Sequence, residues 1–174
     1  GIEADWLAFA DAWRAGYKPG MDTVRRGRRP WANIDVLHRE KLEQLLEDFG
    51  IRGLAEDELQ YLNRAWHRLD PWPEVRAGLT RLKTLGPVAT LSNGNVRLLL
   101  DLARHGGLPF DAIFSAELFG HYKPDPEVYL GTCRLLDLPP QRVTLVAAHP
   151  DDLRAAARCG LGTALVLRPD EQGR

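Results

Sequence analysis

The second part of this sequence alternates between helical patterns and short apolar runs, and this alternation limits the available folds more than any other feature. From residue 74 onward, apolar residues at helical spacing are followed repeatedly by short runs rich in β-branched residues. The expected helices are 74–85, 95–105, 126–136 and 152–159, and the expected strands are 87–91, 112–114, 143–147 and 163–167. Repeated strand-helix units form a parallel sheet with helices on both faces. The sequence therefore predicts an α/β fold, a Rossmann-like parallel sheet sandwiched by helices.

The first 70 residues show only helical patterns. Asp5 is expected to cap a helix over 5–17, which the Lys18-Pro19-Gly20 segment should break or kink. Asp35 is expected to cap a second helix that ends at Gly50. A third helix is expected over 55–68, with its leucines and Trp66 on one face. Because three short helices cannot easily bury their apolar faces alone, this region is expected to pack as a lid on another part of the structure.

The Asp70-Pro71-Trp72-Pro73 segment is the predicted domain boundary. Two prolines within three residues end a helix and stiffen the connection that follows. The expected organisation is a helical cap domain over 1–71 and a Rossmann-like core domain over 72–174.

Composition excludes several classes of protein. The chain has 174 residues, of which 44% are hydrophobic and 27% are charged, so a globular fold is expected rather than disorder. A net charge of −1 argues against a broad surface for nucleic acid or membrane, and the four arginines within 25–29 are too few to change this. No apolar run is long enough to span a bilayer, which makes the cytoplasm the default location.

Three polar loops follow predicted strands. They contain Ser92-Asn93-Gly94-Asn95, the segment 121–129, and the segment 147–152. Because the carboxyl ends of parallel strands lie at one edge of a sheet, and ligands bind outside that edge, these loops are the expected site.

Each polar residue in these loops also has an ordinary structural interpretation. Ser92 or Asn93 could cap the following helix, and Asp152 could cap the helix predicted after it. Lys123 could lie on the surface, and His149 could be a hydrogen-bonded core residue. The functional interpretation depends on the convergence of all of them.

Three motifs in these loops resemble those of a known superfamily. The segments L-S-N-G-N, Y-K-P-D-P-x-x-Y and A-A-H-x-x-D-L are similar, in this order, to motifs of the haloacid dehalogenase superfamily. Within it, the chain most resembles the L-2-haloacid dehalogenase (type II) branch, whose cap domain matches the helical region at 1–70. The resemblance covers essentially the whole chain.

The resemblance implies roles for five residues. Ser92 and Asn93 would bind the substrate carboxylate through the hydroxyl and backbone N–H groups of their loop. Lys123 would hold the nucleophilic carboxylate ionised, because a nearby cation lowers a carboxyl pKa. Tyr129 would be the active-site tyrosine, and Asp152 would fix Lys123 or orient the hydrolytic water.

Further positions distinguish between branches of the superfamily. Arg14 matches the cap arginine that would receive the halide and help to bind the substrate. The phosphatases have a Mg²⁺-binding aspartate four residues before the position of Asp152, and here that residue is Ala148. His149 departs from the branch, which has an asparagine there, and it could contact the nucleophile or water and add a pH dependence.

The superfamily's nucleophile is an aspartate at the end of a strand before the cap, and these residues do not supply it. Asp5 and Asp11 lie in a helical pattern. We expect that the sequence lacks an N-terminal strand and a C-terminal end present in the family; the alternative is an inactive protein.

The predicted function is therefore metal-independent, cofactor-free hydrolysis of short L-2-haloalkanoic acids to 2-hydroxy acids. The alternatives are a phosphatase of the same superfamily acting on a small phosphate ester, and an inactive module that binds a carboxylate or a protein partner. The expected partner is a small haloacid, and the apolar faces of the cap helices are compatible with a homodimer.

Overall fold

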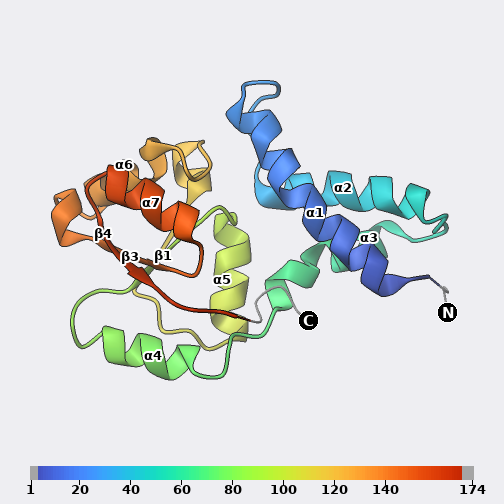
Figure 1. Cartoon of the computed structure of the whole chain (residues 1–174). Helices are drawn as coiled ribbons and strands as arrows, with labels where there is room; N and C mark the ends of the chain where they lie inside the picture. Colours follow the sequence, from blue (N-terminus) through green and yellow to red (C-terminus); the bar gives the residue numbers. More distant parts are fainter. Residues whose placement is uncertain (1–3, 170–174) are drawn as a thin grey trace. The chain divides into compact units, whose positions relative to one another are not determined.

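The computed structural model describes residues 4–169 as two compact units, Gly1–Glu117 and Leu118–Arg174. Figure 1 labels the α-helices of both units and the strands β1, β3 and β4. The α-helices are α1 (Trp6–Arg25), α2 (Ile34–Asp48), α3 (Glu56–Asn63), α4 (Val75–Leu82), α5 (Val96–His105), α6 (Pro126–Leu135) and α7 (Pro150–Arg158). The strands are β1 (Ala89–Ser92), β2 (Ala112–Ser115), β3 (Thr144–Ala147) and β4 (Gly162–Leu165). Short 3₁₀ helices are η1 (Arg64–Arg68), η2 (Ala116–Phe119) and η3 (Pro140–Arg142).

Helix α1 is longer than predicted. Asp5 caps it as expected, with its carboxylate accepting a hydrogen bond from the Ala8 backbone N–H at 3.0 Å. The helix then runs through Pro19 and ends at Arg25, so the prediction that it stops at Tyr17 is wrong. A proline removes one hydrogen bond from a helix, and the packing of α1 against α2 (Figure 1) gives this helix stability beyond its own hydrogen bonds.

The other two N-terminal helices also differ from prediction at their ends. Asn33 caps α2, accepting from the Val36 N–H at 3.1 Å, so Asp35 lies within the first turn instead of at the cap. The third predicted helix is divided into α3 and the 3₁₀ helix η1. Tertiary packing decides these ends, which local propensity fixes only to within a few residues.

The N-terminal helices bury a core of their own. Phe9 and Trp13 of α1 pack with three leucines of α2, and the buried members are Phe9, Trp13, Leu42, Leu45, Leu46 and Ile51. Edge-to-face contacts join Phe9 to Phe49 and Trp13 to Trp66, at centroid distances of 5.2 and 5.4 Å. The apolar stripes that predicted these helices therefore pack largely against one another.

The strands pair in parallel, as predicted, but within each unit only two strands pair. In the first unit β1 pairs with β2, with Ser92 opposite Ser115. In the second unit β3 pairs with β4, with Ala147 opposite Leu165. The parallel pairing and the helices around these strands confirm the α/β class. None of the helices described between residues 4 and 169 is both long and apolar enough to cross a membrane.

Candidate active site

Lys123, Tyr129 and Asp152, three of the residues proposed from the sequence, meet in the second unit. One oxygen of Asp152 lies 2.5 Å from the Lys123 ammonium nitrogen, and the other accepts a hydrogen bond from the Tyr129 hydroxyl at 2.5 Å. The side chains of Lys123 and Asp152 are only 14% and 15% exposed. The carboxylate is thus bound on both oxygens, which fixes the position of the ammonium group beside it.

Three different elements supply these side chains. Lys123 lies in the loop between η2 and α6, Tyr129 lies in the first turns of α6, and Asp152 lies in the first turn of α7. Because α7 begins at Pro150, Asp152 is not its N-cap, and that ordinary interpretation of the residue is wrong. A carboxylate in the first turn is nevertheless favoured by the positive end of the helix dipole.

Tyr129 acts as a hydrogen-bond donor in this cluster. Its side chain is fully buried, and burial raises the pKa of its hydroxyl far above the ordinary value, with the hydrogen bond to Asp152 adding to the effect. The phenol therefore keeps its proton and continues to donate to Asp152 in neutral and moderately alkaline solution.

His149 lies at the N-cap position of α7 and is exposed. Its side chain makes no hydrogen bond to the backbone of the helix that it precedes. The ordinary interpretation, a hydrogen-bonded histidine in the core, is therefore wrong. Ala148, immediately before it, is partly buried and offers no ligand atom on its side chain.

The Ser92 loop belongs to the first unit and begins at the last residue of β1. The Ser92 hydroxyl oxygen accepts a hydrogen bond from the Gly94 N–H at 3.1 Å, which leaves its own hydrogen to be donated elsewhere. Asn93 donates from its side-chain amide to the Met21 sulfur at 3.4 Å. The loop is thus a tight turn in which a hydroxyl and several backbone N–H groups are close together.

Neither Ser92 nor Asn93 caps the helix that follows, contrary to their ordinary interpretation. Asn95 occupies the N-cap position of α5, and the carboxylate of Glu117 accepts the hydrogen bond from the Val96 N–H at 2.8 Å. The other oxygen of Glu117 accepts from the side-chain amide of Asn33 at 3.0 Å. Glu117 has no signal in the sequence that would predict this role, because it lies 21 residues from its partner Val96 and in no recognisable motif.

Arg14 lies on the exposed side of α1. Its neighbour Trp13 is a core residue, 6% exposed, whose indole N–H donates to the His38 carbonyl at 2.9 Å. Tyr17 packs beside the His38 ring, at a centroid distance of 5.9 Å. The two aromatic residues that flank Arg14 in the sequence therefore contribute to the helical core.

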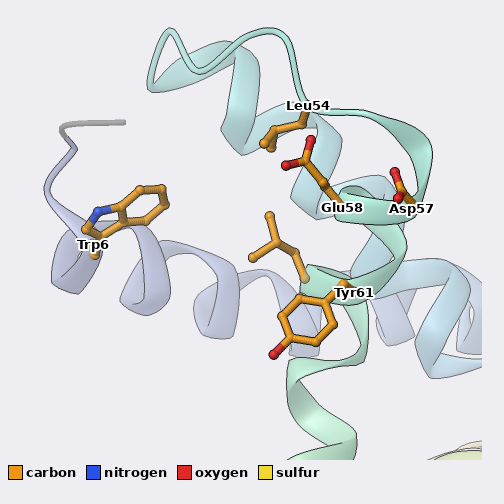
Figure 2. Close-up of a pocket in the computed structure, with 6 residues that line it drawn as sticks. Trp6, Leu54, Asp57, Glu58 and Tyr61 are labelled. Atoms are coloured by element: carbon orange, nitrogen blue, oxygen red, sulfur yellow. The ribbon is translucent and has the colours of Figure 1, made fainter. Parts of the chain in front are cut away.

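A pocket in the helical region lies between α1 and α3. Figure 2 shows residues that line it: Trp6 of α1, Leu54, and Asp57, Glu58 and Tyr61 of α3. None of the predicted site residues lines it. Glu58 already accepts a hydrogen bond from the Ala55 N–H at 2.8 Å. The pocket therefore has no assigned part in the chemistry.

Comparison with known proteins assigns the family. A family model described as haloacid dehalogenase-like hydrolase matches residues 2–160. The chain belongs to the haloacid dehalogenase-like hydrolase family. In this family it is similar to (S)-2-haloacid dehalogenase 1 of Pseudomonas sp. strain CBS-3, with 33% identity over 141 residues. That match covers 79% of this chain and 62% of the relative, so the chain spans less than two thirds of that dehalogenase.

Solved structures agree with this assignment. The L-2-haloacid dehalogenase PA0810 superposes with a TM-score of 0.96 at 54% identity, covering 99% of this chain and 74% of that one. The defluorinating L-2-haloacid dehalogenase Rha0230 superposes equally well, at 47% identity, over 99% of this chain and 71% of its own. The family also includes phosphatases: phosphoglycolate phosphatase of Aquifex aeolicus is 32% identical over 134 residues, 74% of this chain and 62% of that enzyme. The resemblance noted in the sequence is confirmed.

Proposed function

We propose that the protein is a hydrolytic dehalogenase that converts short-chain L-2-haloalkanoic acids to 2-hydroxy acids. The observation that carries the proposal is the third loop, where Asp152 binds Lys123 and Tyr129 and where Ala148 stands at the position of a second carboxylate. A carboxylate that holds the Lys123 ammonium group in place supports a site in which this lysine interacts with an anionic group. Two of the solved structures similar to this chain, at 54% and 47% identity, are those of L-2-haloacid dehalogenases, which supports the same substrate class.

The proposed reaction has two steps. An aspartate carboxylate oxygen attacks C2 of the haloacid from the side opposite the halogen, so that a C–O bond forms, the C–halogen bond breaks and halide leaves. Water then attacks the carbonyl carbon of the resulting ester. The ester C–O bond to the aspartate breaks, and the products are the 2-hydroxy acid with inverted configuration, the free aspartate and a proton.

The site residues would divide this work among themselves. Ser92 and Asn93 would bind the substrate carboxylate, and Arg14 would receive the halide as it leaves. Lys123 would keep the nucleophile ionised, while Tyr129 and Asp152 hold Lys123 in place.

Neither aspartate near the start of α1 fits the role of the attacking carboxylate. Asp5 caps α1, and Asp11 lies on the exposed face of that helix, so neither lies at the end of a strand. His149, exposed at the start of α7, could contact the water or the nucleophile.

The residues present do not fit a catalytic Mg²⁺ ion. Mg²⁺ takes six oxygen ligands in near-octahedral geometry, usually with one or two carboxylates. The third loop offers Asp152, whose two oxygens are already bound to an ammonium group and a hydroxyl, and Asp151, which is 96% exposed and pairs with Arg154 at 2.6 Å, whereas Ala148 offers no ligand. We therefore derive no step through a metal, and the proposed reaction needs no cofactor.

A phosphatase is the second candidate, favoured by the similarity to phosphoglycolate phosphatase. Superfamily phosphatases resemble this chain in the same loops but carry the aspartate that Ala148 replaces. This candidate predicts Mg²⁺-dependent hydrolysis of p-nitrophenyl phosphate. The third candidate, an inactive carboxylate-binding or interaction module, predicts that the full-length protein has no aspartate at the nucleophile position.

The decisive experiment measures halide release from L-2-chloropropionate by the full-length protein, with and without EDTA. We expect release at the same rate in both conditions, and little or no release from the D-enantiomer. Absence of release, or release only with added Mg²⁺, would overturn the proposal. Size-exclusion chromatography with light scattering would test the homodimer in the same preparation.

A further inference from the structure

A buried histidine joins two carboxylates within the first unit. His67 of η1 is 3% exposed, its Nδ1 lies 2.9 Å from Asp101 of α5, and its Nε2 lies 2.9 Å from Asp35 of α2. Arg97 also binds Asp101, at 2.9 and 3.0 Å, and the Arg97 guanidinium together with His67 lowers the pKa of that carboxyl. Three elements are thus tied together through one imidazole ring.

This chain of contacts extends to the Ser92 loop. The second oxygen of Asp35 accepts a hydrogen bond from the side-chain amide of Asn95 at 2.9 Å. Asn95 is the last residue of the loop and is 3% exposed. One carboxylate oxygen of Asp35 is therefore held by His67, and the other binds Asn95 of the loop.

Asn95 is an unusual residue to bury here. It occupies the N-cap position of α5, where an asparagine normally caps the helix with its side chain, and it makes no such bond. Its side-chain oxygen makes no hydrogen bond to any residue in the described part of the chain. Burying an unpaired amide oxygen is unfavourable, so the hydrogen bond that the Asn95 amide donates to Asp35 is the polar contact that favours this side chain in its buried position.

A second contact ties the same end of α2 to the loop. The Asn33 amide donates to Glu117, and Glu117 accepts from the Val96 N–H. Asn33 and Asp35 are separated by one residue at the start of α2. The start of this helix therefore holds the end of the loop from two directions.

We propose that Asp35, oriented by His67, is a positioning residue that fixes the Ser92–Asn95 loop in the geometry that binds the substrate carboxylate. The substrate named here rests on the proposed function, whereas the effect on the loop does not. A displacement of about 1 Å in a binding group can cost up to a hundredfold in rate or affinity. Loss of the Asp35–Asn95 contact should therefore weaken substrate binding more than it slows the chemical step.

The test substitutes Asp35→Asn in the full-length protein. An asparagine side chain has only one acceptor oxygen. If that oxygen accepts from His67, the NH₂ group of the substituted residue faces the NH₂ group of Asn95, and two donors make no hydrogen bond. We expect KM for L-2-chloropropionate to rise at least tenfold while kcat changes less than threefold. Asn95→Ala removes the same contact from the other side, should raise KM in the same way, and replaces D35N if that variant does not fold.

The matched control is Glu56→Gln. Glu56 of α3 pairs with Arg39 of α2 at 2.7 and 2.8 Å, so it also ties α2 to a neighbouring element, but without contact to the loop. We expect its KM to stay within twofold of the wild type. A KM unchanged within twofold in D35N or N95A would overturn the inference, as would an equal rise in E56Q.

A readout that needs no activity separates this inference from the proposed function. In ¹H–¹⁵N spectra, D35N and N95A should shift the backbone amides of Gly94 and Ser92, and E56Q should leave them in place. If the wild type releases no halide, the proposed function fails, and the amide shifts alone decide the inference. Unchanged Gly94 and Ser92 amides in D35N or N95A would overturn it.

Discussion

His38 shows how one buried residue can set the acid stability of the helical region. Its side chain is 5% exposed and packs against Trp66 and Trp13 at centroid distances of 4.8 and 6.2 Å. Its Nδ1 makes no hydrogen bond to any residue of the described chain. Burial lowers its pKa to about 4, an effect that the nearby Asp35 carboxylate opposes in part and that His67 reinforces.

The sign of the resulting pH dependence follows from proton binding. The unfolded chain binds a proton at His38 near pH 6.5, and the folded chain binds it only near pH 4. The neutral, buried ring therefore contributes its full stability above pH 6.5, and that contribution is lost as the pH falls from 6.5 to 4. At pH 5 the loss is about 2 kcal/mol, from about 1.4 kcal/mol for each pH unit.

We predict that His38→Phe makes the protein less sensitive to acid. Phenylalanine keeps an aromatic ring between the two tryptophans and removes both the titration and the unpaired nitrogen. Urea unfolding at pH 7.5 and pH 5 should show a smaller loss of unfolding free energy in the variant, by about 2 kcal/mol. An equal loss in variant and wild type would assign the acid sensitivity to the carboxylates alone.

At the scale of elements, local sequence predicted the helices and strands better than their ends. Apolar periodicity identified every one of the seven α-helices described here, and β-rich runs identified the four strands. Pro19 was expected to interrupt α1, but the packing of α1 on α2 continues past it. The helix predicted over 152–159 begins two residues earlier, at Pro150. Both proline and aspartate are common in the first turn of a helix, so the sequence does not distinguish the two starting points.

Two helical glycines provide a matched test of how tightly the elements pack. A Cβ atom at Gly131 of α6 would lie 2.5 Å from the ring of Phe119, whereas one at Gly78 of α4 would meet nothing within 4 Å. We predict that Gly131→Ala destabilises the protein by about 1–3 kcal/mol through overpacking. Gly78→Ala should stabilise it by up to about 1 kcal/mol, because alanine has the higher helix propensity. Thermal unfolding of both variants checks the pair, and a gain in Tm for G131A would show that Phe119 moves aside freely.

At the scale of the whole molecule, the sequence predicted the chemistry-bearing loops but not the contacts that hold them. The motifs drew attention to Lys123, Tyr129 and Asp152, and hydrogen bonds join these three side chains within the second unit. The contacts that position the Ser92 loop could not be predicted from the sequence, because Asp35 and His67 lie 60 and 28 residues from Asn95. Such partners meet only through the fold, and an aspartate or histidine on a helix has no local signal that distinguishes it from a surface residue.

The proposed mechanism makes a prediction for the complete enzyme that isotope labelling can check. The reaction is run in H₂¹⁸O with enzyme in excess over L-2-chloropropionate, so that each enzyme molecule turns over about once. Water attacks the carbonyl carbon of the aspartyl ester, so ¹⁸O enters the aspartate of the enzyme. The 2-hydroxy acid of this first turnover carries ordinary oxygen. Over many turnovers the labelled carboxylate attacks in its turn, and ¹⁸O then appears in the 2-hydroxy acid. Mass spectrometry of product and digested enzyme distinguishes this from direct attack of water on C2, which would label the product in the first turnover and leave the enzyme unlabelled. The labelled peptide would also identify the nucleophile, and if that peptide lay within α1 the assignment of Asp5 and Asp11 as non-catalytic would be wrong.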